Sequence, residues 1–232
     1  MAVKKTKKSA DKEEKKDEVA EQDLEQAERE LSDLSFLLAS GPPQPFDPSS
    51  VRMLGLYGEI NEEKSSELIY SMHLMKESGK RNVVEDPDAE PSYEYDPFKV
   101  VLSTYGGSAL DMFAIYDTMQ EIKKECEIET SGIGKVMSAG ILLLAAGTKG
   151  KRKIGANCRV MIHGVASGHA GTIHNLENEL EEVQWIQEQF VKSLAKETDM
   201  TVKYIKRLID KKVNVYLDAT EALDLGIVDE II

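Results

Sequence analysis

Two residues that could act together as a nucleophile and its base, Ser138 and His163, lie in one stretch of small and apolar residues. Ser138 occupies a small-residue turn directly before the apolar run 141–146, which predicts a buried helix. The first backbone N–H groups of such a helix have no partners within it and could stabilise an oxyanion. His163 directly follows the apolar run 159–162, which predicts a short buried strand. A serine nucleophile and its base require this combination of parts.

Each of these two residues also has an ordinary structural interpretation. A serine before an apolar helix commonly caps that helix, and a single histidine is commonly a hydrogen-bonded structural residue. Short motifs by themselves match many unrelated sequences. Ser138 or His163 taken alone therefore does not distinguish a catalytic role from a structural one. The length and order of the surrounding sequence pattern have to decide between these roles.

A pair of glycines, Gly106 and Gly107, follows a second apolar segment. Residues 98–103 predict a buried strand and residues 109–124 predict a helix, so residues 104–108 form the predicted turn between them. Paired glycines let a backbone approach a ligand closely. The alternative interpretation is an ordinary strand-to-helix turn.

The motif GKVMSAGILLLAAGTKGKR, followed by NCRVMIHG, resembles the family of the Clp protease proteolytic subunit (ClpP). The segment IYDTMQEIK and the C-terminal run YLDATEALDLGIVDEII are similar to the same family, so the resemblance covers roughly residues 51–232. It implies an α/β protein with the ClpP/crotonase-like fold, built from repeated ββα units with a protruding handle helix. It also implies a serine endopeptidase that cleaves unfolded polypeptides inside an oligomeric chamber.

The resemblance implies a role for each residue of the predicted site. Ser138 would attack the peptide carbonyl, His163 would take its proton, and the backbone N–H groups of Gly107 and Ala139 would hold the oxyanion. Residues 164–171 would form a strand that pairs with the bound peptide. The residues implied for substrate binding are Gly106, Gly164, Val165 and Ala166.

The third member of the triad has more than one candidate, because this chain is about two residues longer than the family pattern between Ile205 and Tyr216. Alignment on the C-terminal run places Asn214 where the family usually has an aspartate. An asparagine can orient a neutral histidine, but it cannot stabilise the imidazolium by charge. Asp210 and Asp218 are the alternatives.

Three other functions remain open on the sequence. The chain could be a catalytically weak or silent ClpP-like subunit that co-assembles with an active paralogue, which Asn214 suggests. It could belong to the wider enoyl-CoA-hydratase-like fold, in which paired N–H groups stabilise a thioester enolate. A serine–lysine peptidase with Lys135 as its base is the third.

The composition narrows the classes of partner and compartment. The 232 residues carry a net charge of −13, which argues against nucleic acid as the main partner. The two cysteines, Cys126 and Cys158, have no zinc-site spacing, and the predicted chemistry needs no metal or cofactor. No stretch predicts a membrane span, and the lysine-rich start lacks the apolar core of a signal peptide. We therefore expect a soluble, cytoplasmic protein.

The chain divides into a charged N-terminal extension, residues 1–48, and a ClpP-like peptidase domain, residues 49–232. The first eighteen residues are almost entirely charged or small, so they predict disorder. Residues 21–39 carry leucine and alanine at helical spacing, which predicts an amphipathic helix. Its alternatives are a helix lying on its own subunit and a docking or assembly segment.

Within the domain, residues 51–60 predict a strand, residues 61–78 a helix, and the proline-rich residues 79–97 an inserted surface loop. Residues 172–197 predict a long helix with an exposed apolar face, and the resemblance makes this helix the handle that joins two rings. The implied assembly is a homo-oligomer of heptameric rings, a tetradecamer when doubled. Its implied partners are polypeptide substrates and a separate AAA+ unfoldase.

Overall fold

The computed structural model describes residues 51–84, 90–211 and 213–232. The predicted extension over residues 1–48, with its helix at 21–39, lies outside these residues, and the domain boundary at residue 49 stays a prediction. No helix in the described ranges is both long enough and apolar enough to cross a membrane.

The centre of the domain is a mostly parallel sheet with the strand order β1-β4-β5-β6-β9. Every neighbouring pair along this path is parallel, as expected of strands joined by helical crossovers. The strands are β1 (Met53–Ile60), β4 (Phe98–Gly107), β5 (Ile128–Met137), β6 (Arg152–Ile154) and β9 (Glu230–Ile231). The prediction of an α/β fold is confirmed.

Strand β5 changes its partner halfway along its length. Its first half pairs with β6, and its second half pairs in parallel with β7 (Arg159–Ile162). Strand β8 (Val215–Leu217) then lies antiparallel to β7. As a result β4, β5 and β7 all end at the same edge of the sheet, where parallel α/β proteins commonly bind their ligands.

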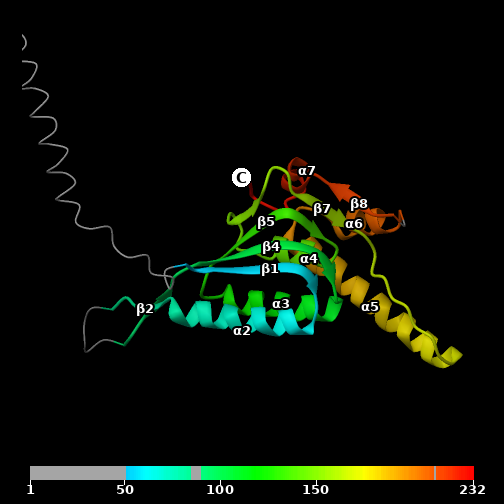
Figure 1. Cartoon of the computed structure of the whole chain (residues 1–232), viewed down its shortest axis with the longest axis horizontal. Helices are drawn as coiled ribbons and strands as arrows, with labels where there is room; N and C mark the ends of the chain where they lie inside the picture. Colours follow the sequence, from blue (N-terminus) through cyan, green and yellow to red (C-terminus); the bar gives the residue numbers. More distant parts are fainter. Residues whose placement is uncertain (1–50, 85–89, 212) are drawn as a thin grey trace, which may run out of the picture. The chain divides into compact units, whose positions relative to one another are not determined.

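Two helices, α2 (Glu62–Ser78) and α3 (Ala109–Ile122), pack against each other beside β1 and β4 (Figure 1). Each begins at a capping residue whose side chain accepts a backbone N–H of the first turn, Asn61 for α2 and Ser108 for α3. The helices predicted over 61–78 and 109–124 are therefore confirmed to within two residues.

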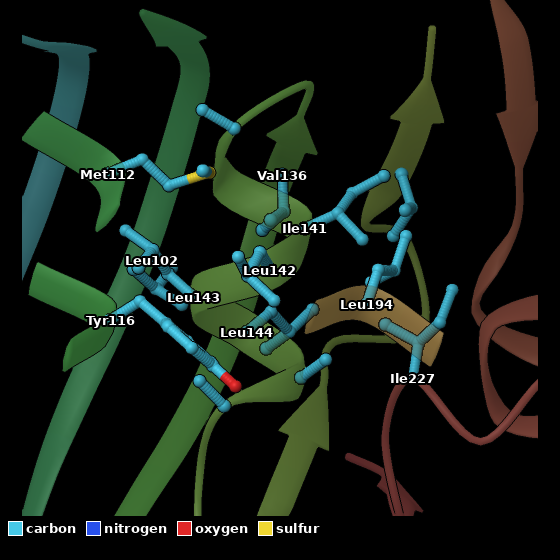
Figure 2. Close-up of a cluster of buried hydrophobic side chains, with 14 of the residues drawn as sticks. Leu102, Met112, Tyr116, Val136, Ile141, Leu142, Leu143, Leu144, Leu194 and Ile227 are labelled. Atoms are coloured by element: carbon cyan, nitrogen blue, oxygen red, sulfur yellow. The ribbon is translucent and has the colours of Figure 1, made fainter. Parts of the chain in front are cut away.

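The short helix α4 (Gly140–Ala145) forms the middle of the hydrophobic core (Figure 2). All six of its residues are buried, as the apolar run predicted. It contacts β4, β5 and α3 on one side and α5 on the other. The labelled side chains around it include Leu102, Met112, Tyr116, Val136, Leu194 and Ile227.

The long helix α5 (Ile173–Glu197) extends away from the sheet (Figure 1), and α6 (Val202–Ile209) and α7 (Ala219–Asp224) complete the domain. The C-terminal half of α5 packs into the core through Phe190 and Leu194. The predicted exposed apolar face is present on the other half, where Trp185 is 52% exposed. The other exposed apolar residues are Ile173, Leu176 and Leu180.

Two predictions about connecting segments are wrong. The region 79–97 is not only a loop, because Lys80–Asn82 (β2) pairs with Tyr93–Tyr95 (β3) in an antiparallel ribbon. The Nζ of Lys80, in β2, lies 4.2 Å from the centre of the Tyr93 ring in β3, a cation–π contact within the ribbon. The turn predicted at 104–108 is also shorter, since β4 continues through Gly107.

A buried arginine joins the C-terminal elements to the core. Arg152 is 3% exposed, and its Nε lies 2.8 Å from a carboxylate oxygen of Asp229. Its guanidinium also donates to the carbonyl oxygens of Ala145, Glu197 and Gly226, at the ends of α4 and α5 and just after α7. Burial alone would raise the pKa of Asp229, but its hydrogen bonds and charge interaction with Arg152 hold this pKa below the ordinary value.

We expect Asp229→Ala to lower the free energy of unfolding by about 3–5 kcal/mol, because it leaves the buried Arg152 charge uncompensated. A carboxyl with a depressed pKa stabilises the fold above its unfolded pKa of about 4, and this contribution is lost as the pH falls through the folded pKa. The difference between wild type and variant in urea denaturation should therefore shrink below about pH 4. Asp224→Ala, at the exposed end of α7, is the control, and an equal loss there would contradict the assignment.

Candidate active site

The pairing of β5 with β7 brings Ser138 and His163 together. Met137 at the end of β5 is paired with Met161 in β7, and Ser138 directly follows β5 as His163 directly follows β7. The Ser138 N–H donates to the Met161 carbonyl over 2.8 Å. The Ser138 Oγ lies 2.7 Å from the His163 Nε2, which is the distance of a nucleophile from its general base.

The backbone of Ser138 is unusual. With φ of 54° it is the one non-glycine residue in the left-handed region among the residues that the structure describes. This conformation costs about 1–2 kcal/mol and is typical of residues held in place at functional sites. The residue that caps α4 is Ala139, and no side chain serves as the cap. The hydroxyl of Ser138 is therefore directed to His163 and does not cap the helix.

The glycine pair lies against the serine. A Cβ atom on Gly106 would be 2.6 Å from the Cβ of Ser138 and 3.1 Å from the Ala139 nitrogen, so no side chain fits there. A Cβ atom on Gly107 would be 2.1 Å from the Ile60 carbonyl oxygen. The Ala139 N–H has no acceptor among the described residues. A free donor next to the nucleophile is the arrangement that an oxyanion hole needs.

Sequence reasoning missed Thr104, whose side chain makes a hydrogen bond to the backbone of the glycine turn. Its side chain is fully buried, and its hydroxyl accepts the Gly106 N–H over 2.9 Å and donates to the Gly58 carbonyl. Its Cγ2 also lies 2.5 Å from the position that a Cβ on Gly140 would take, so the missing side chain at Gly140 lets the start of α4 lie against Thr104. A threonine two residues before a glycine was the available signal, since such hydroxyls often bond the nearby backbone.

Ser138 and His163 open into a cavity of about 520 Å³, a volume typical of sites for small ligands or side chains. Every predicted site residue except Asn214 lines this cavity. The other residues that line the cavity are largely apolar, and Glu59 is the charged one among them. They are Glu59, Tyr105, Ser108, Ala109, Met112, Met161 and Phe190.

Residues 164–171 pair with no strand of the described chain, and their pairing with a bound peptide stays a prediction. A strand needs a neighbouring strand to bond with, and in the described part of the chain this segment instead contacts helix α5. The Val165 N–H donates to the side-chain oxygen of Gln187 over 3.2 Å. Gly164, Val165 and Ala166 nevertheless line the cavity, next to His163.

The three candidates for the third triad position differ in their surroundings. Asn214 and Asp210 both line a cavity of about 370 Å³ that also contacts His163. Neither makes a hydrogen bond to His163 within the described residues. Asp218 has another role, because its carboxylate accepts the Glu221 N–H over 2.9 Å as the cap of α7.

The pairing of β7 with β8 distinguishes Asn214 from Asp210. Ile162 is paired with Val215 in antiparallel register. The pairing ends there, and its register continued by one step along both chains would put Asn214 opposite His163. Asp210 lies at the end of α6, outside this pairing.

The serine–lysine alternative finds less support at this site. The Lys135 Nζ lies 4.5 Å from the centre of the Tyr105 ring, so this amine is engaged in a cation–π contact, and the hydroxyl of Ser138 is bonded to His163. Among the described residues, no cluster of histidine, cysteine, aspartate and glutamate is arranged to hold a metal ion.

Comparison with known proteins agrees with this architecture. Residues 89–232 match the family model described as Clp protease, and the chain therefore belongs to the Clp protease family. It is similar to the ATP-dependent Clp protease proteolytic subunit 1 of Bifidobacterium longum (strain NCC 2705), with 41% identity over 132 residues. The matched region spans 56% of this chain and 55% of that relative.

We expect Gly106→Ala to slow labelling of Ser138 by a fluorophosphonate probe by about a hundredfold, because its Cβ must displace the nucleophile. Gly150→Ala is the matched control: Gly150 also has a left-handed φ of 82°, but nothing lies within 4 Å of its Cβ position. Both variants should lose about 1 kcal/mol or more of stability in thermal unfolding. Equal labelling rates in the two variants would show that Gly106 does not position Ser138.

Proposed function

We propose that this protein is a serine endopeptidase that cleaves unfolded polypeptides, as the proteolytic subunit of a Clp-type protease. The observation that carries the proposal is the 2.7 Å contact between the Ser138 Oγ and the His163 Nε2 at the wall of the cavity. Membership of the Clp protease family and the printed name of the B. longum relative support it.

In the proposed reaction, the Ser138 Oγ attacks the carbonyl carbon of a peptide bond, and His163 takes the hydroxyl proton on Nε2. The carbonyl oxygen becomes an oxyanion that the N–H groups of Gly107 and Ala139 stabilise. His163 then gives its proton to the leaving amine, which breaks the C–N bond and leaves an acyl-enzyme. Water, deprotonated by His163, releases the acid and restores Ser138.

Asn214 is the residue that we propose to orient His163. The strand register supports it, because residues directly opposite in an antiparallel pair have Cβ atoms only about 5 Å apart. Its amide oxygen would accept the Nδ1–H of His163 and so keep Nε2 free to accept the serine proton. An amide carries no charge, so the imidazolium would be less stabilised than beside an aspartate.

We further propose that copies of this chain assemble into heptameric rings and that two rings form a tetradecameric chamber. This chamber would receive its substrates from an AAA+ unfoldase. The exposed apolar residues of α5 support an assembly contact, since a free monomer rarely leaves such a surface uncovered. The relative is named an ATP-dependent protease subunit, which supports a separate ATP-driven partner. Mass photometry that finds only monomers or dimers would contradict the chamber.

A cytoplasmic location is part of the same proposal. Cys126 and Cys158 are free and buried, which is in keeping with a reducing compartment. Cell fractionation that recovers the protein only outside the cytoplasm would contradict it.

Ser138→Ala should abolish both fluorophosphonate labelling and cleavage of an unfolded peptide, because it removes the nucleophile. Peptide mapping of the labelled wild type should find the probe on Ser138 alone, and the variant should form particles of unchanged size. Labelling that persists in Ser138→Ala would refute the assignment. A wild-type chain that assembles but is neither labelled nor active would instead indicate a silent subunit.

Asn214→Asp should raise the turnover of peptides by about tenfold to a hundredfold, because it adds a negative charge beside His163. The same charge favours the protonated imidazole, so the acid limb of the pH profile should move to higher pH. Asp210→Asn is the matched control from the same cavity. If that change destroys activity while Asn214→Asp has no effect, Asp210 is the third member.

A further inference from the structure

A side chain of the handle helix holds the backbone beside the catalytic histidine. The side-chain oxygen of Gln187, in the middle of α5, accepts the N–H of Val165 over 3.2 Å. Val165 is two residues after His163 and lines the same cavity as Ser138. The contact thus links a helix outside the sheet to the wall of the active site.

The fit around this contact is close. A Cβ atom on Gly164 would lie 3.0 Å from the side-chain oxygen of Gln187 and 3.0 Å from the Cγ2 of Ile209, in α6. The backbone at residue 164 is therefore confined between Gln187 and Ile209. Only a residue without a side chain fits there unless one of these neighbours moves.

A second contact joins the same segment to the same helix. The Nε2 of His169 lies 3.2 Å from a carboxylate oxygen of Glu179. Glu179 and Gln187 are two helical turns apart, a rise of about 12 Å, and four residues of extended chain span about 13 Å. The two contacts therefore match a segment that runs alongside α5 in an extended conformation, as the trace in Figure 1 does.

We propose that Gln187 is a positioning residue for substrate binding: it holds residues 164–166 in the extended conformation to which a peptide substrate can add as a neighbouring strand. This inference rests on the proposed peptidase function. The side-chain oxygen of Gln187 takes the N–H of Val165, which in an extended chain points away from the N–H groups of Gly164 and Ala166. Those two residues then present their backbone groups to the substrate.

Without this acceptor, the Val165 N–H must find water, and the segment loses the contact that fixes its orientation. A peptide would then have to order the segment while binding, at a cost in affinity. The chemistry at Ser138 would be unchanged, because Ser138 and His163 are placed by β5 and β7. Gln187 should therefore affect the binding of long peptides and leave the reactivity of Ser138 intact.

The test uses the full chain with Ser138→Ala, so that a fluorescent unfolded peptide binds without being cleaved. Adding Gln187→Met, which keeps the length of the side chain and removes the acceptor, should weaken binding in an anisotropy titration by about threefold to tenfold. Hydrogen exchange at the Val165 amide should become faster in the same variant. Gln187→Glu keeps an acceptor oxygen and should bind within about twofold of the parent.

Gln184→Met is the matched control, since Gln184 is one turn earlier on α5 and makes no hydrogen bond to residues 164–171 in the described structure. It should leave both readouts unchanged. Equal peptide affinity with and without Gln187→Met, or unchanged exchange at Val165, would overturn the inference. Fluorophosphonate labelling of chains that retain Ser138 tests the peptidase function separately, and Gln187→Met should be labelled at the wild-type rate.

Discussion

The parallel pairing of β5 with β7 is the constraint on which the site depends. Two parallel strands in register end at the same edge of a sheet, so the residues that follow them are neighbours whatever their separation in the chain. Here the pairing of Met137 with Met161 is extended by the bond from the Ser138 N–H to the Met161 carbonyl. His163 is two residues after Met161, so its Nε2 comes to lie 2.7 Å from the Ser138 Oγ.

The burial of the helix that follows Ser138 offsets the free-energy cost of the strained Ser138 backbone. The left-handed φ costs about 1–2 kcal/mol, whereas each fully buried leucine of α4 contributes about 1.5–3 kcal/mol. Leu142, Leu143 and Leu144 are all buried, so α4 keeps its position although no side chain caps it. The unused cap leaves the Ser138 hydroxyl for His163, and the Ala139 N–H without an acceptor among the described residues.

The sequence allowed the local elements to be predicted where a single pattern controls them. The apolar run after Ser138 predicted a buried helix and the run before His163 a buried strand, and both occur. Contacts between distant segments carry no such pattern. The bond from the Thr104 hydroxyl to the Gly58 carbonyl and the Gln187 oxygen on Val165 depend on how strands and helices pack, and neither was predicted. The β2–β3 ribbon was missed for a related reason, since its pairing spans a long polar segment.

The two halves of the site are held by interactions of different strength. Ser138, Ala139 and the glycine turn rest on β4, β5 and α4, where the contacts are buried and a shifted residue would meet other atoms. Among the described residues, residues 164–166 are held by one hydrogen bond, from the Val165 N–H to the side chain of Gln187, and by packing against Ile209. Asn214 directly precedes β8 and lines the 370 Å³ cavity that Gly164 and Val165 also line. Local opening costs least where buried contacts are few. We therefore expect Ser138 and the Ala139 N–H to be the fixed part of the site. Residues 164–166 and Asn214, which we propose to receive the peptide and to orient His163, should be the part that moves without unfolding the core.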